Sequence, residues 1–264
     1  MGFGAGSMGI NALIYVIAAV VSAFFGVLAG FGVVYVYNRM PARWLCDYDE
    51  EPDERHLPPR VAKQPWGVLF SATMALATFK VATLVSWQYA AAMLPALCAL
   101  LLISLADRKY RIIPDQFVIV LAVTGIGFAA IGRKFAPFTS NEPDVAAVMA
   151  RLGFLSPIFG LLMGGGAFLA VSLIGKIVTK QEVMGFGDVK LMAVCGLISG
   201  ADGVLLIMVM TALSSAMTFV FLMSRGKLKR TDDEPLGPFI AGATAVYLIF
   251  SEELSWLSTY YFGG

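Results

Sequence analysis

Long apolar runs, separated by short polar stretches, constrain the fold of this 264-residue chain more than any other feature. Apolar residues make up 58% of the chain, charged residues only 14%, and the mean hydropathy is +0.78. Soluble domains do not have this composition. Because backbone polar groups in lipid must be satisfied inside each segment, the runs predict transmembrane helices. The expected class is an all-α polytopic membrane protein.

About eight transmembrane helices are expected. They cover residues 10–37, 66–87, 89–106, 116–131, 152–178, 188–200, 204–223 and 238–250. The first run is too long for a signal-peptide core and no positive residue precedes it, which predicts a retained span. The longest hydrophilic stretch, residues 43–65, is expected to be a solvent loop, and residues 133–151 form a further polar segment with no assigned role. We divide the chain into residues 1–65, the first helix with its loop, and residues 66–264, a membrane-embedded domain.

The basic residues indicate the orientation, because cytoplasmic loops carry an excess of lysine and arginine. With the N-terminus outside, 15 of the 19 basic residues fall on the cytoplasmic side. These are Arg39, Arg43, Arg55, Arg60, Lys63, Arg108, Lys109, Arg111, Lys176, Lys180, Lys190, Arg225, Lys227, Lys229 and Arg230. Eight spans with N-out and C-out topology are therefore expected. The net charge of +1 conceals this segregation and gives no indication of a nucleic-acid partner.

The three cysteines, Cys46, Cys98 and Cys195, form no CxxC pair. Neither a disulfide framework nor a cysteine metal site is expected. The only histidine, His56, lies in the loop at residues 43–65 and is interpreted as a surface residue rather than a ligand.

The stretch from Met184 to Lys190 places Asp188 after a Gly-x-Gly break, at the start of an apolar run. Asp107 closes another apolar run, and the topology puts both at cytoplasmic helix ends. Ionisable groups at membrane depth are costly and usually functional. Taken singly, Asp188 is equally well read as a helix cap and Asp107 as a loop residue. Taken together, they predict an intramembrane acid–base pair.

Two carboxylates held close together share a proton, so one acts as base toward water while the other donates to the substrate carbonyl. The expected reaction is peptide hydrolysis by an activated water, without a covalent intermediate or a cofactor, and the pair should titrate as a unit. Gly185 and Gly187 remove side-chain bulk near Asp188, which would let an extended peptide approach.

Several motifs together carry a family resemblance. They are Ser104-Leu105-Ala106-Asp107, Pro114-Asp115-Gln116, Met184 to Leu191, Asn38-Arg39-Met40-Pro41, Glu182, and Leu236-Gly237-Pro238-Phe239. In sequence and order they resemble the bacterial type IV prepilin peptidases, the GxGD aspartyl proteases of the inner membrane. The resemblance implies an endopeptidase that acts at the cytoplasmic side of the bacterial inner membrane. It would remove the basic leader of prepilins or pseudopilins, cutting after a glycine.

By motif match, Asp107 and Asp188 become the catalytic pair. Asp115 is expected to cap a helix or shape a loop, and Glu182 and Lys190 to support the pair electrostatically or to line a helix end. Longer members of the family carry two CxxC pairs in the first loop and also methylate the product; this loop has only Cys46. S-Adenosylmethionine would be a cofactor only if methylation is retained.

An acidic run in the first loop contains Asp49, Glu50, Glu51 and Asp53. It is read as a solvated loop or, alternatively, as a site that attracts the positive leader of the substrate. Lys80, inside a predicted span, either snorkels, faces water or contacts substrate. Two other functions stay open: a proton-coupled transporter that uses the aspartates as a relay, and a scaffold for pilus or secretion assembly.

Overall fold

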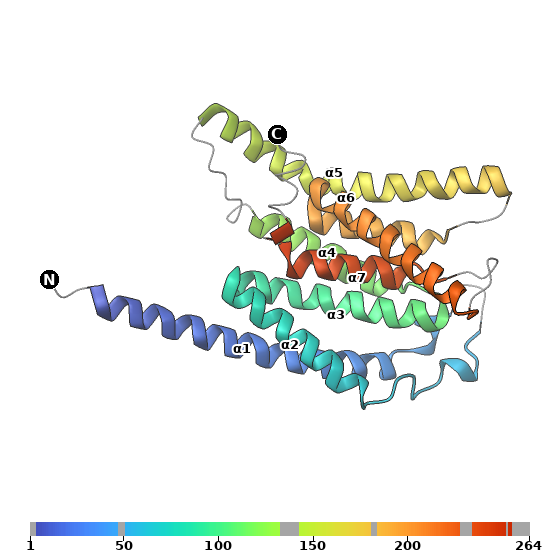
Figure 1. The fold of residues 1–264 in the computed structure, drawn as a ribbon, viewed down its shortest axis with the longest axis horizontal. Coiled ribbons are helices and arrows are strands. Elements are labelled where there is room, and N and C mark those ends of the chain that lie inside the picture. Colours follow the sequence, from blue (N-terminus) through green and yellow to red (C-terminus); the bar gives the residue numbers. More distant parts are fainter. Residues whose placement is uncertain are drawn as a thin grey trace. The chain divides into compact units, whose positions relative to one another are not determined.

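A computed structural model describes residues 4–46, 51–132, 143–180, 184–227, 234–251 and 253–254. These residues form helices and connecting segments, with no β-strand among them (Figure 1). The α-helices are α1 (Gly4–Arg39), α2 (Trp66–Leu84), α3 (Trp87–Tyr110), α4 (Asp115–Gly132), α5 (Pro143–Thr179), α6 (Phe186–Ser224) and α7 (Gly237–Ile249). Two 3-10 helices, η1 (Ala42–Leu45) and η2 (Glu54–His56), lie in the first loop. The expected all-α class is confirmed.

Within the described ranges, five of these helices are long and apolar enough to cross a membrane, namely α1, α2, α3, α5 and α6. Two more, α4 and α7, are apolar but shorter. The protein is therefore a multi-pass membrane protein. Helix α5 begins at Pro143, and its candidate membrane span, Leu155–Thr179, agrees with the expected run at residues 152–178. Proline suits the first turn of a helix, where its missing N–H is not needed.

Helix α6 accounts for the difference between the expected eight helices and the seven in the described part of the chain. Its range contains two helical runs joined by a kink at Gly200, whose φ of 74° and ψ of −178° are not helical. A Cβ built on Gly164 of α5 would lie 2.7 Å from the Met192 carbonyl oxygen and 2.9 Å from Val204 Cγ2. In a straight helix these two residues would be about 18 Å apart. The chain therefore reverses at Gly200, and the two expected runs are the two arms of α6.

The reversal has a local cause in the small and polar residues around it. Glycine tolerates the positive φ that the turn requires. The Ser156 hydroxyl of α5 accepts a hydrogen bond from the Ala201 amide at 3.2 Å, which satisfies one of the free N–H groups at the start of the second arm.

The chain forms two compact units, Met1–Cys98 and Ala99–Gly264, with α3 beginning in the first and ending in the second. In the first unit, α1 packs closely on α2 through glycine. A Cβ on Gly26 would lie 2.5 Å from Thr78 Oγ1, and one on Gly30 would collide with the Ser71 backbone. The Ser71 hydroxyl donates to the Val27 carbonyl at 3.1 Å, which adds a polar contact between the helices.

Most described residues of the first loop are exposed, as expected, but hydrogen bonds fix part of the loop to the end of α1. Arg60, only 7% exposed, donates to the carbonyl oxygen of Tyr37 at the end of α1 and to that of His56, at 2.7–2.9 Å. The Asn38 side chain accepts hydrogen bonds from the backbone amides of Arg60 and Val61. The interpretation of His56 as a surface residue was wrong. It is 5% exposed, and its Nδ1 lies 2.8 Å from Asp53 Oδ1, because the fold closes the loop over it.

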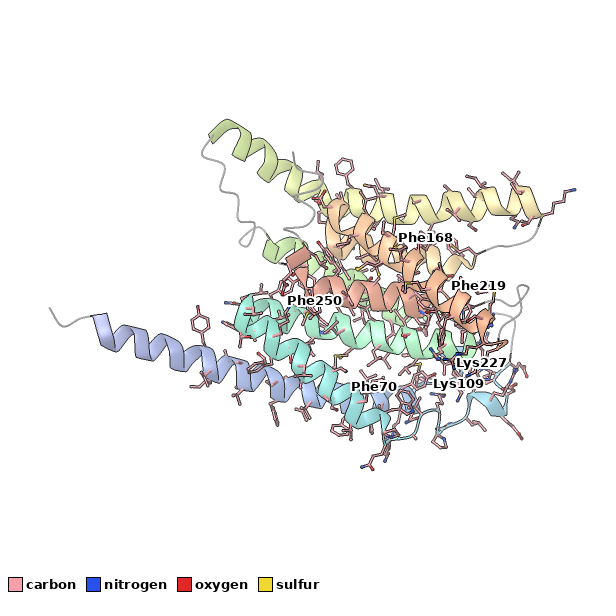
Figure 2. The ribbon with its side chains drawn as sticks, viewed as in Figure 1. Phe70, Lys109, Phe168, Phe219, Lys227 and Phe250 are labelled. Carbon is pink, nitrogen blue, oxygen red and sulfur yellow. The ribbon has the colours of Figure 1, made fainter. Side chains whose placement is uncertain are left out.

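In the second unit, α5 and α6 lie side by side (Figure 1). Phe168 of α5 is 8% exposed and occupies the space toward α6 (Figure 2). The closest approach is between glycines: a Cβ on Gly160 would collide with the Gly196 carbonyl oxygen and lie 2.6 Å from the Gly200 carbonyl carbon. Only a residue without a side chain allows this spacing.

We expect Gly160→Ala to destabilise the protein by about 1–3 kcal/mol, because the added methyl group meets backbone that has no freedom to move aside. Gly166→Ala is the matched control on the same helix, since a Cβ there would have no heavy atom within 4 Å. That change should be neutral or slightly stabilising. Thermal unfolding in detergent measures both; equal unfolding temperatures would contradict the glycine contact.

Candidate active site

Asp107 lies in the last turn of α3 and is buried, with 5% of its surface exposed. Its Oδ2 accepts a hydrogen bond from the backbone amide of Gly237 at 2.9 Å. Its own carbonyl oxygen accepts from the Arg111 amide at 2.8 Å, which closes the end of the helix. Asp107 is thus held by a segment 130 residues away in the chain, so it is not merely a loop residue.

Gly237 is the first residue of α7, and Pro238 follows it in the first turn. The first N–H groups of a helix have no partner inside the helix, and proline has none to offer. The helix start carries no side-chain cap, so the Asp107 carboxyl group is the acceptor for the Gly237 amide. A Cβ on Gly237 would lie 2.5 Å from Asp107 Oδ2 and 3.0 Å from its Cγ. Glycine is therefore required for this contact.

Gly237 is the site residue that sequence reasoning missed, since the Gly-Pro pair was used only as the opening of the last span. A signal was present. A helix that begins with Gly-Pro and has no Ser, Thr, Asp or Asn immediately before it lacks its own cap, so its free amides must find an acceptor elsewhere.

Asp188 is the third residue of α6 and is half-buried. Gly185 occupies the N-cap position, where there is no side-chain cap hydrogen bond. The alternative interpretation of Asp188 as a helix cap is therefore wrong. Asp188 lies close enough to Asp107 for the two carboxyl groups to interact electrostatically. Both aspartates of the predicted pair lie in the second unit.

The two glycines around Phe186 have different surroundings. A Cβ on Gly187 would lie 3.3 Å from the Ile113 side chain, in the loop between α3 and α4. For a Cβ on Gly185, the nearest atom would be Asp188 Oδ2 at 3.7 Å. Gly187 thus allows the start of α6 to pack on the loop after Asp107, whereas Gly185 leaves space beside the Asp188 carboxyl group.

A salt bridge joins the starts of α4 and α6. Lys190 Nζ lies 3.0 Å and 3.3 Å from the two carboxylate oxygens of Asp115. The same ammonium group lies 5.3 Å from the centre of the Phe186 ring. Asp115 is the first residue of α4, which agrees with its expected position at a helix start.

Other predicted site residues fall elsewhere. Glu182, Asp49 and Glu50 lie outside the described residues. Glu51 is exposed and Lys80 is half-buried in α2, both in the first unit. Asp53 binds Arg55, with 2.6 Å between its Oδ2 and Nε, and this hydrogen bond lowers the pKa of the Asp53 carboxyl group. No metal site is apparent, because the described parts of the chain hold no cluster of three or more His, Cys, Asp or Glu residues suited to a metal ion.

The fold and the site define a multi-pass helical membrane protein with two aspartates brought together from separate helix ends. Residues 94–223, which carry both aspartates, match the model of the type IV leader peptidase family. This region of the chain belongs to that family, and the predicted resemblance is confirmed.

Curated relatives agree with the family match. The prepilin leader peptidase/N-methyltransferase of Pseudomonas aeruginosa is 27% identical over 185 residues, which are 68% of this chain and 58% of that protein. That of Stutzerimonas stutzeri is 28% identical over 64% of this chain and 53% of its own length. Leader peptidase HopD of Escherichia coli is 27% identical over 55% of this chain and 84% of its own length. The chain thus spans little more than half the length of the first two relatives. No solved structure matches the chain significantly.

Proposed function

We propose that the protein is a membrane aspartyl endopeptidase that removes the basic leader from type IV prepilins or pseudopilins, cutting after a glycine. The observation that carries the proposal is that Asp107 and Asp188 lie within range of electrostatic interaction inside the family-matched region. The names of the relatives, prepilin leader peptidase and leader peptidase, support the reaction and the substrate class.

In the proposed mechanism the two aspartates share a proton and activate a water molecule. The Gly237 amide holds Oδ2 of Asp107, and Oδ1 would hold the water. Asp188 then donates its proton to the substrate carbonyl group. The absence of a side chain at Gly185 would leave room for the extended peptide beside Asp188. No bound group is required for these steps.

The proposed setting is the bacterial inner membrane, with eight crossings, both termini outside and the active site on the cytoplasmic side. The two arms of α6 support eight crossings, since 39 residues in a straight helix would span about 58 Å, nearly twice the hydrocarbon core. Lys109 and Lys227 lie toward one end of the second unit and Phe250 toward the other, which fits a basic cytoplasmic end (Figure 2).

The test is direct. The purified protein in detergent is incubated with a prepilin that has a basic leader and a glycine before the cleavage site, with S-adenosylmethionine present. We expect a single cleavage after the glycine, seen by electrophoresis and mass spectrometry. A product mass increased by one methyl group would show that methylation is retained. An uncleaved substrate, under conditions in which a known prepilin peptidase cuts it, would overturn the proposal.

The acidic run gives a further prediction. Replacing Asp49, Glu50 and Glu51 with their amides should raise the Michaelis constant at low salt by several fold, because fewer negative charges attract the basic leader. The same variant carries Asp53→Asn, because an asparagine side chain can still accept the hydrogen bond that caps η2. The difference in Michaelis constant between variant and parent should become smaller at high salt, where surface charges are screened. An unchanged Michaelis constant at low salt would mean that the run is only a solvated loop.

A further inference from the structure

We infer that Asp115 and Lys190 form a tether that holds the start of α6, and with it Asp188, against the helix end that carries Asp107. Both are positioning residues that act through Asp188. The inference rests on the proposed function, because its main effect is observed as a change in the cleavage rate.

Asp115, one partner of the tether, directly follows the short connection between α3 and α4. Asp107 lies in the last turn of α3, and only residues 111–114 separate that helix from Asp115 at the start of α4. The turn is closed by the hydrogen bond from the Arg111 amide to the Asp107 carbonyl oxygen at 2.8 Å. Arg111 also has a φ of 57°, so the chain bends sharply there. A displacement of Asp115 is therefore transmitted over a short path to Asp107.

On the other side, Lys190 follows Asp188 by two residues in α6. Its ammonium group binds both oxygens of Asp115 and lies over the ring of Phe186, the residue between the two glycines. The Ile113 side chain packs against Gly187, 3.3 Å from the position that a Cβ on this glycine would take. The start of α6 is thus held at two points, by Ile113 in the α3–α4 connection and by Asp115 at the start of α4, with Asp188 between Gly187 and Lys190.

The exposure of the pair decides which measurement is informative. The side chains of Lys190 and Asp115 are 37% and 41% exposed. Ion pairs this accessible to solvent contribute little to folding free energy. A catalytic group displaced by about 1 Å, however, costs roughly 100-fold in rate. The tether should therefore affect turnover far more than thermal stability.

The experiment compares Lys190→Met, Asp115→Asn, both changes together, and the charge swap Asp115→Lys with Lys190→Asp. Each single change should lower kcat about tenfold to 100-fold while KM changes by less than about threefold. The double neutral variant should be no slower than the slower single variant, because both changes break the same contact. The charge-swap variant should have a kcat at least threefold higher than that of either single variant. The unfolding temperatures of all variants should stay close to that of the parent.

Arg225→Met is the matched control, because it removes a cation that packs over a phenylalanine of the same helix, 4.8 Å from the Phe221 ring centre. Its activity should stay within about twofold of the parent. Single variants that turn over like the parent, or a double variant whose loss is the product of the two single losses, would overturn the tether.

A second measurement does not depend on cleavage. Hydrogen exchange at residues 186–192 should be faster in both single variants and return toward the parent rate in the swap, while exchange in the second arm of α6 stays constant. Unchanged exchange at residues 186–192 would also overturn the tether. If the parent fails to cleave prepilin, the proposed function fails, and the exchange data still decide whether the tether exists.

Discussion

Asp188→Asn and Asp107→Asn are each expected to lower the rate of prepilin cleavage by about 1,000-fold or more. General acid and base groups each contribute on the order of 100-fold to 10,000-fold, and neither amide can exchange a proton with water or the substrate carbonyl. The double variant should be little worse than either single variant, because the pair acts as a unit. Initial rates with purified protein in detergent measure the effect.

Asp202→Asn is the matched control. Asp202 is an exposed carboxylate of the same helix, just after the turn at Gly200, and its loss should change the rate by less than about twofold. All variants should be inserted in the membrane and unfold near the parent temperature. Cleavage by either Asn variant within tenfold of the parent would exclude the two-aspartate mechanism. A transporter or an assembly scaffold would show no cleavage by the parent either.

Gly237→Ala is expected to have the second largest effect, a loss of about 100-fold in kcat. The new methyl group would stand 2.5 Å from Asp107 Oδ2, 3.0 Å from Cγ and 3.2 Å from Cβ, so the carboxyl group must move away. A displacement of about 1 Å is enough for a loss of this size. The hydrogen bond from the Gly237 amide, 2.9 Å long, would be stretched at the same time.

The control for this change is Gly242→Ala on the same helix, where a Cβ would have no heavy atom within 4 Å. It should retain activity within about twofold and unfold at the parent temperature or slightly above. Steady-state kinetics separate the two positions. Equal activities of the two alanine variants would show that Asp107 does not need the close approach of α7.

Much of the helical content could be predicted from hydropathy alone, because an apolar run of sufficient length has few alternatives to a helix in lipid. Helices α2, α3, α4 and α7 begin and end within a few residues of the predicted runs. The predicted run at residues 152–178 matches the membrane span of α5, Leu155–Thr179, but hydropathy did not reveal that the helix begins earlier, at Pro143. The burial of His56 was missed, since composition does not reveal that Arg60 donates hydrogen bonds to the carbonyl oxygens of His56 and of Tyr37 at the end of α1.

For this protein, the sequence by itself determined the membrane class, the helical runs, the two aspartates and the family of residues 94–223. These depend on properties of single residues or of short motifs, such as hydropathy and the spacing around Gly187 and Asp188. The tertiary structure decided the reversal of α6 at Gly200, the capture of Asp107 by the Gly237 amide and the pairing of Asp115 with Lys190. The two paired contacts join residues 75 to 130 positions apart, and the reversal depends on how closely α5 packs against α6. Such arrangements are fixed by the packing of whole helices, which no local pattern encodes.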